Sequence, residues 1–209
     1  MRIAVDMDEV LADTLAKQLA WLRGEYGHTL TPEMLAGRRL EDAVPPEHCQ
    51  ALEARIHRSG FFADLPLITA SQQVVQELSA HNEIFVATAA MEYPGSFAAK
   101  FDWLARYFPF IPASHIVFCG DKSILAADFL IDDNAHHLRS FRGHGVLFTA
   151  PHNMYVTDYP RVNGWEGVRH MFLSDTHSVS RHDRQGSDVL NRCVRQIGSF
   201  DLNGASITA

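Results

Sequence analysis

Short runs of β-branched and aromatic residues, separated by helical patterns, constrain the fold of this chain more than any other feature. Each run is almost continuously apolar, as is typical of strands buried on both faces of a parallel sheet. Strands are predicted at residues 3–5, 84–88, 116–119, 129–131 and 146–149. The apolar spacing over residues 71–80 and 96–108 predicts helices between them. Strands that alternate with helices form right-handed βαβ units, so we expect an α/β fold with a doubly wound parallel sheet.

A long insertion separates the first predicted strand from the second. Residues 14–69 carry helical patterns at 15–26 and 48–58, broken by prolines. Since one crossover needs far fewer residues, we expect a small helical cap over the carboxyl ends of the strands, where open α/β sheets bind ligands. The predicted domains are a core of residues 1–13 and 70–174, a cap of residues 14–69, and a polar tail of residues 175–209 with one short helix near 189–197.

Composition and charge limit the classes of function. The chain has 209 residues, 46% of them hydrophobic, which suffices for a core without disulfides. Its formal net charge of −7 disfavours binding to long nucleic acid or an anionic membrane, because both repel an acidic protein.

Cellular location is also an expectation from the sequence. Cys49, Cys119 and Cys193 lack the spacing of a zinc site or a disulfide framework. We find no signal-peptide pattern, and no apolar run approaches the ~20 residues of a membrane span. We therefore expect a cytoplasmic protein, and the sequence leaves a homodimer open.

Carboxylates follow two of the predicted strands. Asp6 and Asp8 come after the first strand, and Asp132 and Asp133 come after the fourth. Because parallel strands bring their carboxyl ends to one edge of the sheet, we expect these acids to converge. Such a cluster repels itself unless a divalent cation is bound, and oxygen ligands without a nearby His or Cys indicate Mg²⁺.

Two further strand ends complete a candidate phosphate site. Thr88 offers a hydroxyl, Ala89 a backbone N–H, and Lys122 a positive charge. A phosphate dianion approaches a carboxylate only where cations offset the repulsion. Each element alone is more often structural, since acids cap helices and a lone lysine is usually at the surface. Together, in strand-end order, they predict a magnesium-dependent enzyme acting on small phosphate monoesters.

This order of motifs resembles the haloacid dehalogenase (HAD) superfamily of aspartate-nucleophile phosphotransferases. Longer strings are similar to the 5'(3')-deoxyribonucleotidases, namely DMDEVLAD at 6–13, SGFF at 59–62, DKS at 121–123, LIDD at 130–133, LFT at 147–149 and HN at 152–153. The similarity covers residues 1–173. It implies a HAD-like fold with a helical cap, a phosphoryl-aspartate intermediate, and (deoxy)ribonucleoside monophosphates as substrates.

The resemblance also implies a role for each acid. Asp6 would be the nucleophile and a Mg²⁺ ligand. Asp8 would bind the metal through its backbone carbonyl, and its side chain would act as general acid and then general base. Asp133 would be the third ligand, with Asp132 supporting it. The residues expected to contact substrate are Thr88, Ala89 and Lys122 at the phosphoryl group and Phe61, Phe62 and Lys100 elsewhere.

Several positions depart from the family pattern. Glu9 replaces a Gly common in the animal enzymes, and Thr14 stands where those enzymes place a substrate-stacking Phe. Ala89 replaces a Ser, and Gly120 replaces an Arg two residues before the lysine. These departures bear on substrate preference, because the nucleophile, the acid and the metal ligands are all retained.

Three alternatives remain open. The same machinery could serve another small ester, such as a sugar phosphate, and a cap without base-stacking aromatics would favour this. A non-catalytic phosphate-binding domain would have lost the nucleophile or the acid, but Asp6 and Asp8 are both present. A receiver domain also groups acids with a Thr and a Lys, but it has no long insertion after its first strand.

Overall fold

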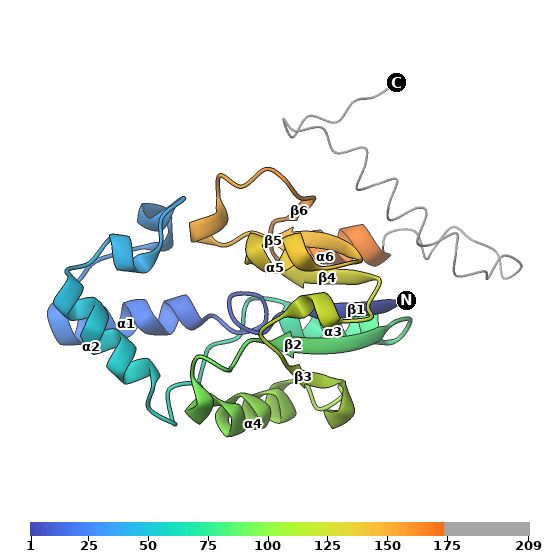
Figure 1. The fold of residues 1–209 in the computed structure, drawn as a ribbon, viewed down its shortest axis with the longest axis horizontal. Coiled ribbons are helices and arrows are strands. Elements are labelled where there is room, and N and C mark those ends of the chain that lie inside the picture. The colour runs from blue at the N-terminus through green and yellow to red at the C-terminus, as the bar shows by residue number, and fades with distance from the viewer. Residues whose placement is uncertain (174–209) are drawn as a thin grey trace, which may run out of the picture.

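A six-stranded parallel sheet forms the centre of the computed structural model, which describes residues 1–173 (Figure 1). The strand order is β3-β2-β1-β4-β5-β6. The strands are β1 (Arg2–Val5), β2 (Glu83–Thr88), β3 (Ile116–Phe118), β4 (Phe129–Asp132), β5 (His144–Phe148) and β6 (Arg161–Val162). The α/β fold with a parallel sheet is confirmed, and the first five strands lie within two residues of their predicted bounds. We did not predict β6, which pairs with β5 at the sheet edge.

Helices cover both faces of the sheet. They are α1 (Thr14–Tyr26), α2 (Pro46–Ile56), α3 (Ser71–Ser79), α4 (Phe97–Tyr107), α5 (Ala135–Ser140) and α6 (Gly164–Leu173). The first four match predicted helices, whereas α5 and α6 were not predicted. The helix expected near residues 189–197 lies outside the described residues.

Side chains alternate between two cores, one on each face of the sheet. Ile3, Val5 and Ile131 belong to the larger core, which α3, α4 and α6 complete. Ala4 and Leu130, the alternate residues of the same strands, belong to a smaller core under α5. This period of two in strands covered on both sides explains why the strand sequences are apolar throughout.

The segment between β1 and α3 lies to one side of the sheet, where α1 and α2 extend away from it (Figure 1). The indole of Trp103 in α4 donates to the carbonyl of Leu65 at 2.9 Å and ties the end of this segment to the core. That the segment is a separate cap domain stays a prediction. None of the helices within residues 1–173 is long and apolar enough to cross a membrane.

A contact of Gly37 joins another part of the same segment to the core. The N–H of Gly37 donates to the carbonyl of Pro151 at 2.8 Å. Gly37 has a φ of +69°, and a Cβ there would lie 2.2 Å from a ring carbon of Tyr155. The insertion therefore meets the loop after β5 at a point where any side chain would have to displace the ring of Tyr155.

Replacing this glycine tests the contact. Gly37→Ala should lower the Tm more than Gly27→Ala, because Gly27 has a similar φ of +73° but nothing within 4 Å of its Cβ position. Both variants lose about 1 kcal/mol to left-handed backbone strain, and Gly37→Ala must also displace the Tyr155 ring. Thermal unfolding measures the difference, and adding Tyr155→Ala should remove it. Equal losses in the two single variants would contradict the contact.

Candidate active site

The acids of β1 and β4 meet at the carboxyl edge of the sheet. The two strands are neighbours in parallel register, with Val5 opposite Ile131. The N–H of Asp6 extends this pairing by donating to the carbonyl of Ile131 at 2.9 Å. The chain winds in opposite directions on either side of these strands, so Asp6 and Asp133 stand at the topological switch point, where open sheets bind ligands.

A fully buried lysine stands behind the nucleophile candidate. The ammonium of Lys122 donates to Oδ1 of Asp6 and to Oδ2 of Asp132, the latter at 2.5 Å. Burial opposes the charge on Lys122, but the two carboxylates outweigh it and raise its pKa. The three side chains thus form a buried ion cluster that joins the ends of β1 and β4 to the loop after β3.

Asp132 is the structural member of the acid pair. Its side chain is fully buried and also accepts from the N–H of Asn134 at 2.8 Å and from Nδ1 of His137 at 3.0 Å. Burial would raise its pKa, but Lys122 and His137 outweigh burial, so the pKa of Asp132 is lowered. Its carboxylate is fully engaged with protein groups, as a supporting role requires.

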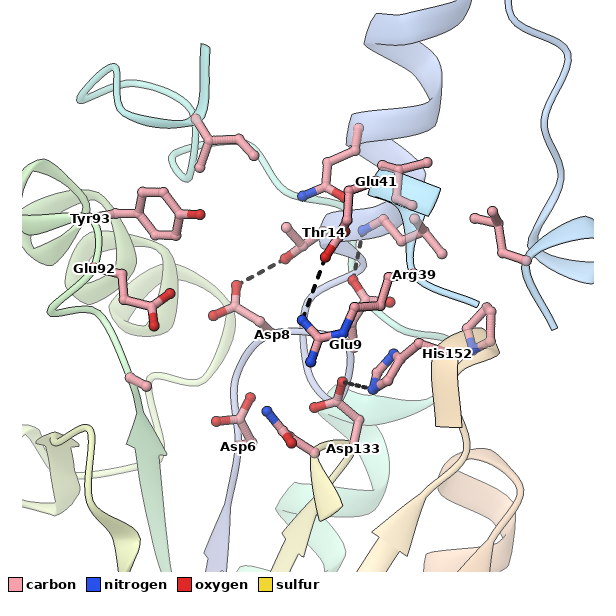
Figure 2. A pocket seen from close by; sticks show the side chains of 18 of the residues that line it. Asp6, Asp8, Glu9, Thr14, Arg39, Glu41, Glu92, Tyr93, Asp133 and His152 are labelled. Carbon is pink, nitrogen blue, oxygen red and sulfur yellow. Dashed lines mark hydrogen bonds and ion pairs between the residues drawn. The ribbon is translucent and has the colours of Figure 1, made fainter. Parts of the chain in front are cut away.

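Asp6 and Asp133 are less well compensated. Burial raises the pKa of Asp6 to about 6, with Lys122 opposing and neighbouring acids adding. Burial and then the charges of Asp132 and Asp6 raise the pKa of Asp133 well above its usual value. Nε2 of His152 lies 3.6 Å from Oδ2 of Asp133 (Figure 2), but burial lowers the pKa of His152 and so disfavours its charged form. This excess of buried negative charge is what a bound cation would relieve.

The donor set fits Mg²⁺. Asp6 and Asp133 offer carboxylate oxygens, and Asp8 offers a backbone carbonyl, all of them hard ligands. Among the described residues, no three His, Cys, Asp or Glu side chains form a ready-made metal cluster. Asp6, Asp133 and the backbone carbonyl of Asp8 would hold the ion, since Mg²⁺ in proteins usually binds through one or two carboxylates and keeps several waters.

Both oxygens of Asp8 are held by cationic or hydroxyl donors. Lys100 donates to Oδ2 at 2.5 Å, and the hydroxyl of Thr14 donates to Oδ1 at 2.9 Å. Lys100 also donates to the hydroxyl of Thr88 at 3.1 Å and is 1% exposed. The carboxyl group of Asp8 is therefore fixed at the pocket wall, and Lys100 links it to Thr88 at the end of β2.

Glu9 takes the backbone conformation of the glycine it replaces. Its φ is +58°, in the left-handed region. Its Oε1 accepts from the N–H of Leu15 at 2.6 Å, and Asp13 accepts from the N–H of Ala16 at 2.8 Å. The two acids cap the first turn of α1. Burial raises the pKa of Glu9 to about 8.

One pocket opens over these acids (Figure 2). Of the predicted substrate residues, Ala89, Phe62 and Lys100 line it, while Thr88 and Lys122 are buried beside it. Phe61 is fully buried in the core, with the ammonium of Lys17 4.8 Å from its ring centre.

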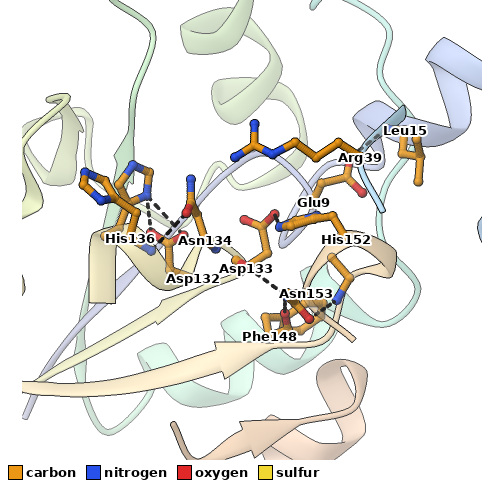
Figure 3. A network of polar contacts seen from close by, with 12 residues as sticks. Glu9, Leu15, Arg39, Asp132, Asp133, Asn134, His136, Phe148, His152 and Asn153 are labelled. Atoms are coloured by element: carbon orange, nitrogen blue, oxygen red, sulfur yellow. Dashed lines mark hydrogen bonds and ion pairs between the residues drawn. The ribbon is translucent and has the colours of Figure 1, made fainter. Parts of the chain in front are cut away.

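The pocket also contains residues that we did not predict. They include Gln18, Arg38, Arg39, Tyr93, His137 and His152. In Figures 2 and 3 the guanidinium of Arg39 lies over Glu9 and Asp133. Only His152 belongs to a string quoted from the sequence, HN at 152–153; the others lie in loops or at single helix positions that the fold alone brings to the site.

A buried asparagine holds the loop after β5 against the acid pair (Figure 3). The side-chain amide of Asn153 donates to the carbonyls of Asp133 at 2.7 Å and Phe148 at 2.8 Å. Arg161 in turn donates to Oδ1 of Asn153 at 2.9 Å. The unpredicted strand β6 thus supports the position of Asp133 through Arg161 and Asn153.

Comparisons with known proteins identify the family of the chain. Residues 1–177 match the model of the family "5' nucleotidase, deoxy (Pyrimidine), cytosolic type C protein". A Staphylococcus epidermidis protein, provisionally named a 5'(3')-deoxyribonucleotidase, is 43% identical over 83% of this chain and 96% of its own length. The Bacillus subtilis 5'(3')-deoxyribonucleotidase is 37% identical over 82% of this chain and 98% of its own length.

Solved structures confirm the fold. A HAD-like hydrolase from Streptococcus pneumoniae superposes with a TM-score of 0.53 at 14% identity, over 81% of this chain and 97% of that chain. A magnesium-bound HAD hydrolase from Bacillus subtilis, also provisionally named, gives 0.51 at 14% identity over the same shares. The fold is HAD-like, and by its sequence the chain belongs to the family of cytosolic type C 5'-deoxynucleotidases.

Proposed function

We propose that this protein is a magnesium-dependent phosphatase that hydrolyses (deoxy)ribonucleoside monophosphates through a phosphoryl-aspartate on Asp6. The observation that carries the proposal is the pairing of Asp6 with Lys122 at the floor of a pocket whose wall holds Asp8. Membership of the nucleotidase family and the names of the relatives support the substrate class. A cytoplasmic location and a homodimer stay predictions from the sequence.

The first step is attack on phosphorus by Asp6. Lys122 occupies Oδ1, which leaves the other carboxylate oxygen to form the new bond as the ester oxygen departs. Asp8, oriented by Lys100 and Thr14, gives its proton to the departing oxygen. Asp6 and Asp133 with the carbonyl of Asp8 would hold Mg²⁺, which when bound supplies charge that offsets the phosphoryl oxygens.

The second step releases phosphate. Asp8, now ionised, takes a proton from a water molecule, and the oxygen of that water attacks the phosphoryl group on Asp6. The bond between phosphorus and Asp6 breaks, and the carboxylate returns to its pairing with Lys122. We also propose that residues 14–69 act as the cap over a core of residues 1–13 and 70–174, because α1 and the loop of Arg39 line the pocket above the acids.

Asp6→Asn should abolish turnover, by at least about 10³-fold in kcat, because shape is kept while nucleophilicity is lost. The matched control is Asp102→Asn on the exposed face of α4, which should keep full activity. Phosphate release measures activity, and thermal unfolding checks that both variants fold. Undiminished phosphate release by Asp6→Asn would remove the mechanism.

Chelation should stop the enzyme. We expect EDTA to abolish phosphate release, Mg²⁺ to restore it, and Ca²⁺ to restore less, since Ca²⁺ prefers more ligands at longer distances. Calorimetric titration with Mg²⁺ gives a second readout, in which Asp133→Asn should weaken binding. Full activity in chelator would exclude the metal role.

A phosphate-release panel tests the substrate class. It compares 5' and 3', deoxy and ribo, and pyrimidine and purine monophosphates, with sugar phosphates as controls. We expect kcat/KM for nucleoside monophosphates to exceed that for sugar phosphates. Exclusive turnover of sugar phosphates would instead establish the alternative of a sugar phosphatase on the same machinery.

A further inference from the structure

Helix α1 extends from the reacting atoms into the pocket. Its first residue, Thr14, donates to Asp8, the group assigned to the leaving oxygen. Thr14, Leu15 and Gln18 all line the pocket, and this spacing places them on one face of the helix. Gln18 therefore lies one helical turn, about 6 Å, beyond Thr14 along the helix axis.

Apolar and aromatic side chains line the same pocket and suit a planar ring. Leu35 and Ile56 come from the same insertion, and Phe62 is 3% exposed at the pocket edge. The ring of Phe62 lies 5.9 Å from that of Tyr93, which also lines the pocket. Aromatic and aliphatic walls of this kind bury the faces of a planar heterocycle and leave its polar edge to be matched by a hydrogen-bonding group.

The side-chain amide of Gln18 has no hydrogen-bond partner within residues 1–173. Its neighbour on α1 differs, because the ammonium of Lys17 donates to the carbonyl of Phe61 and to Asp64. Gln18 is half-buried and lines the pocket. Its two donor hydrogens and its acceptor oxygen have no protein partner there.

We propose that Gln18 reads the edge of the nucleobase and so determines that the substrate is a nucleotide. This inference rests on the proposed function. A nucleoside monophosphate carries its base one sugar ring beyond the ester oxygen, which is the direction in which α1 places Gln18. The amide of Gln18 carries a donor and an acceptor side by side. The edge of a base carries an acceptor and a donor side by side, so the two can form a pair of hydrogen bonds.

The amide also predicts how selective the contact is. A glutamine side chain can turn over and exchange its oxygen and nitrogen, so it matches the edge of uracil or thymine as well as that of cytosine. Gln18 is therefore expected to separate nucleotides from base-free sugar phosphates more strongly than it separates one pyrimidine from another. Its role is specificity, since it touches neither the phosphoryl group nor Asp8.

Gln18→Met tests the contact, because methionine keeps the length of the side chain and removes its hydrogen bonds. We expect kcat/KM for deoxynucleoside 5'-monophosphates to fall about tenfold, chiefly through KM, as for the loss of one or two neutral hydrogen bonds. Inhibition by inorganic phosphate, and by 2-deoxyribose 5-phosphate, should stay within twofold of the wild type. Gln50→Met, the same change on the exposed face of α2, should alter neither measurement.

The outcomes separate this contact from the proposed function. Unchanged nucleotide kinetics in Gln18→Met would overturn the contact, and so would an equal weakening of inorganic phosphate and nucleotide, which would indicate a general effect on the pocket. A wild-type enzyme without nucleotide turnover would instead overturn the proposed function, and the contact with it, before any variant is compared.

Discussion

The ion cluster of Lys122 with Asp6 and Asp132 is the interaction on which the rest of the site depends. A fully buried ammonium is costly, and removing one partner from such a cluster leaves an uncompensated charge. The cluster joins the residue after β1, the last residue of β4 and the segment after β3, so the same contacts hold the strand ends and the candidate site together. One carboxylate of the cluster, that of Asp6, also lines the pocket.

The cluster also sets the electrostatics of the pocket above it. Lys122 pairs with Asp6 and Asp132, but Asp133 and Glu9 have raised pKa values because burial and neighbouring acids are not offset there. Protein groups thus neutralise the back of the site, whereas the raised pKa values of Asp133 and Glu9 show that the carboxyl groups at its front ionise less readily. A cation bound beside Asp133 would favour the ionised form of these carboxyl groups, while Lys122 keeps Asp6 in place at the pocket.

The sequence predicted those parts of the fold and the site that have a repeating apolar pattern or a recognisable motif. Continuous apolar runs predicted five strands, and the acids after β1 and β4 predicted which edge of the sheet forms the site. The two-residue strand β6 and the six-residue helix α5 are too short to show a period. Phe61 and Phe62 are adjacent and chemically identical, so only the tertiary packing separates a core residue from a pocket residue.

The hydrogen bond from Thr14 to Asp8 has a consequence for how Asp8 is aimed. Thr14 is the first residue of α1, and Glu9 beside the nucleophile caps the same helix, so a tilt of the insertion away from the sheet would strain both bonds together. Asp8 would then lose the hydrogen bond from Thr14, one of the two that fix its carboxyl group, whenever the entrance of the pocket widened. If residues 14–69 act as the proposed cap, the aim of the Asp8 carboxyl group would therefore depend on how closely this segment packs on the sheet.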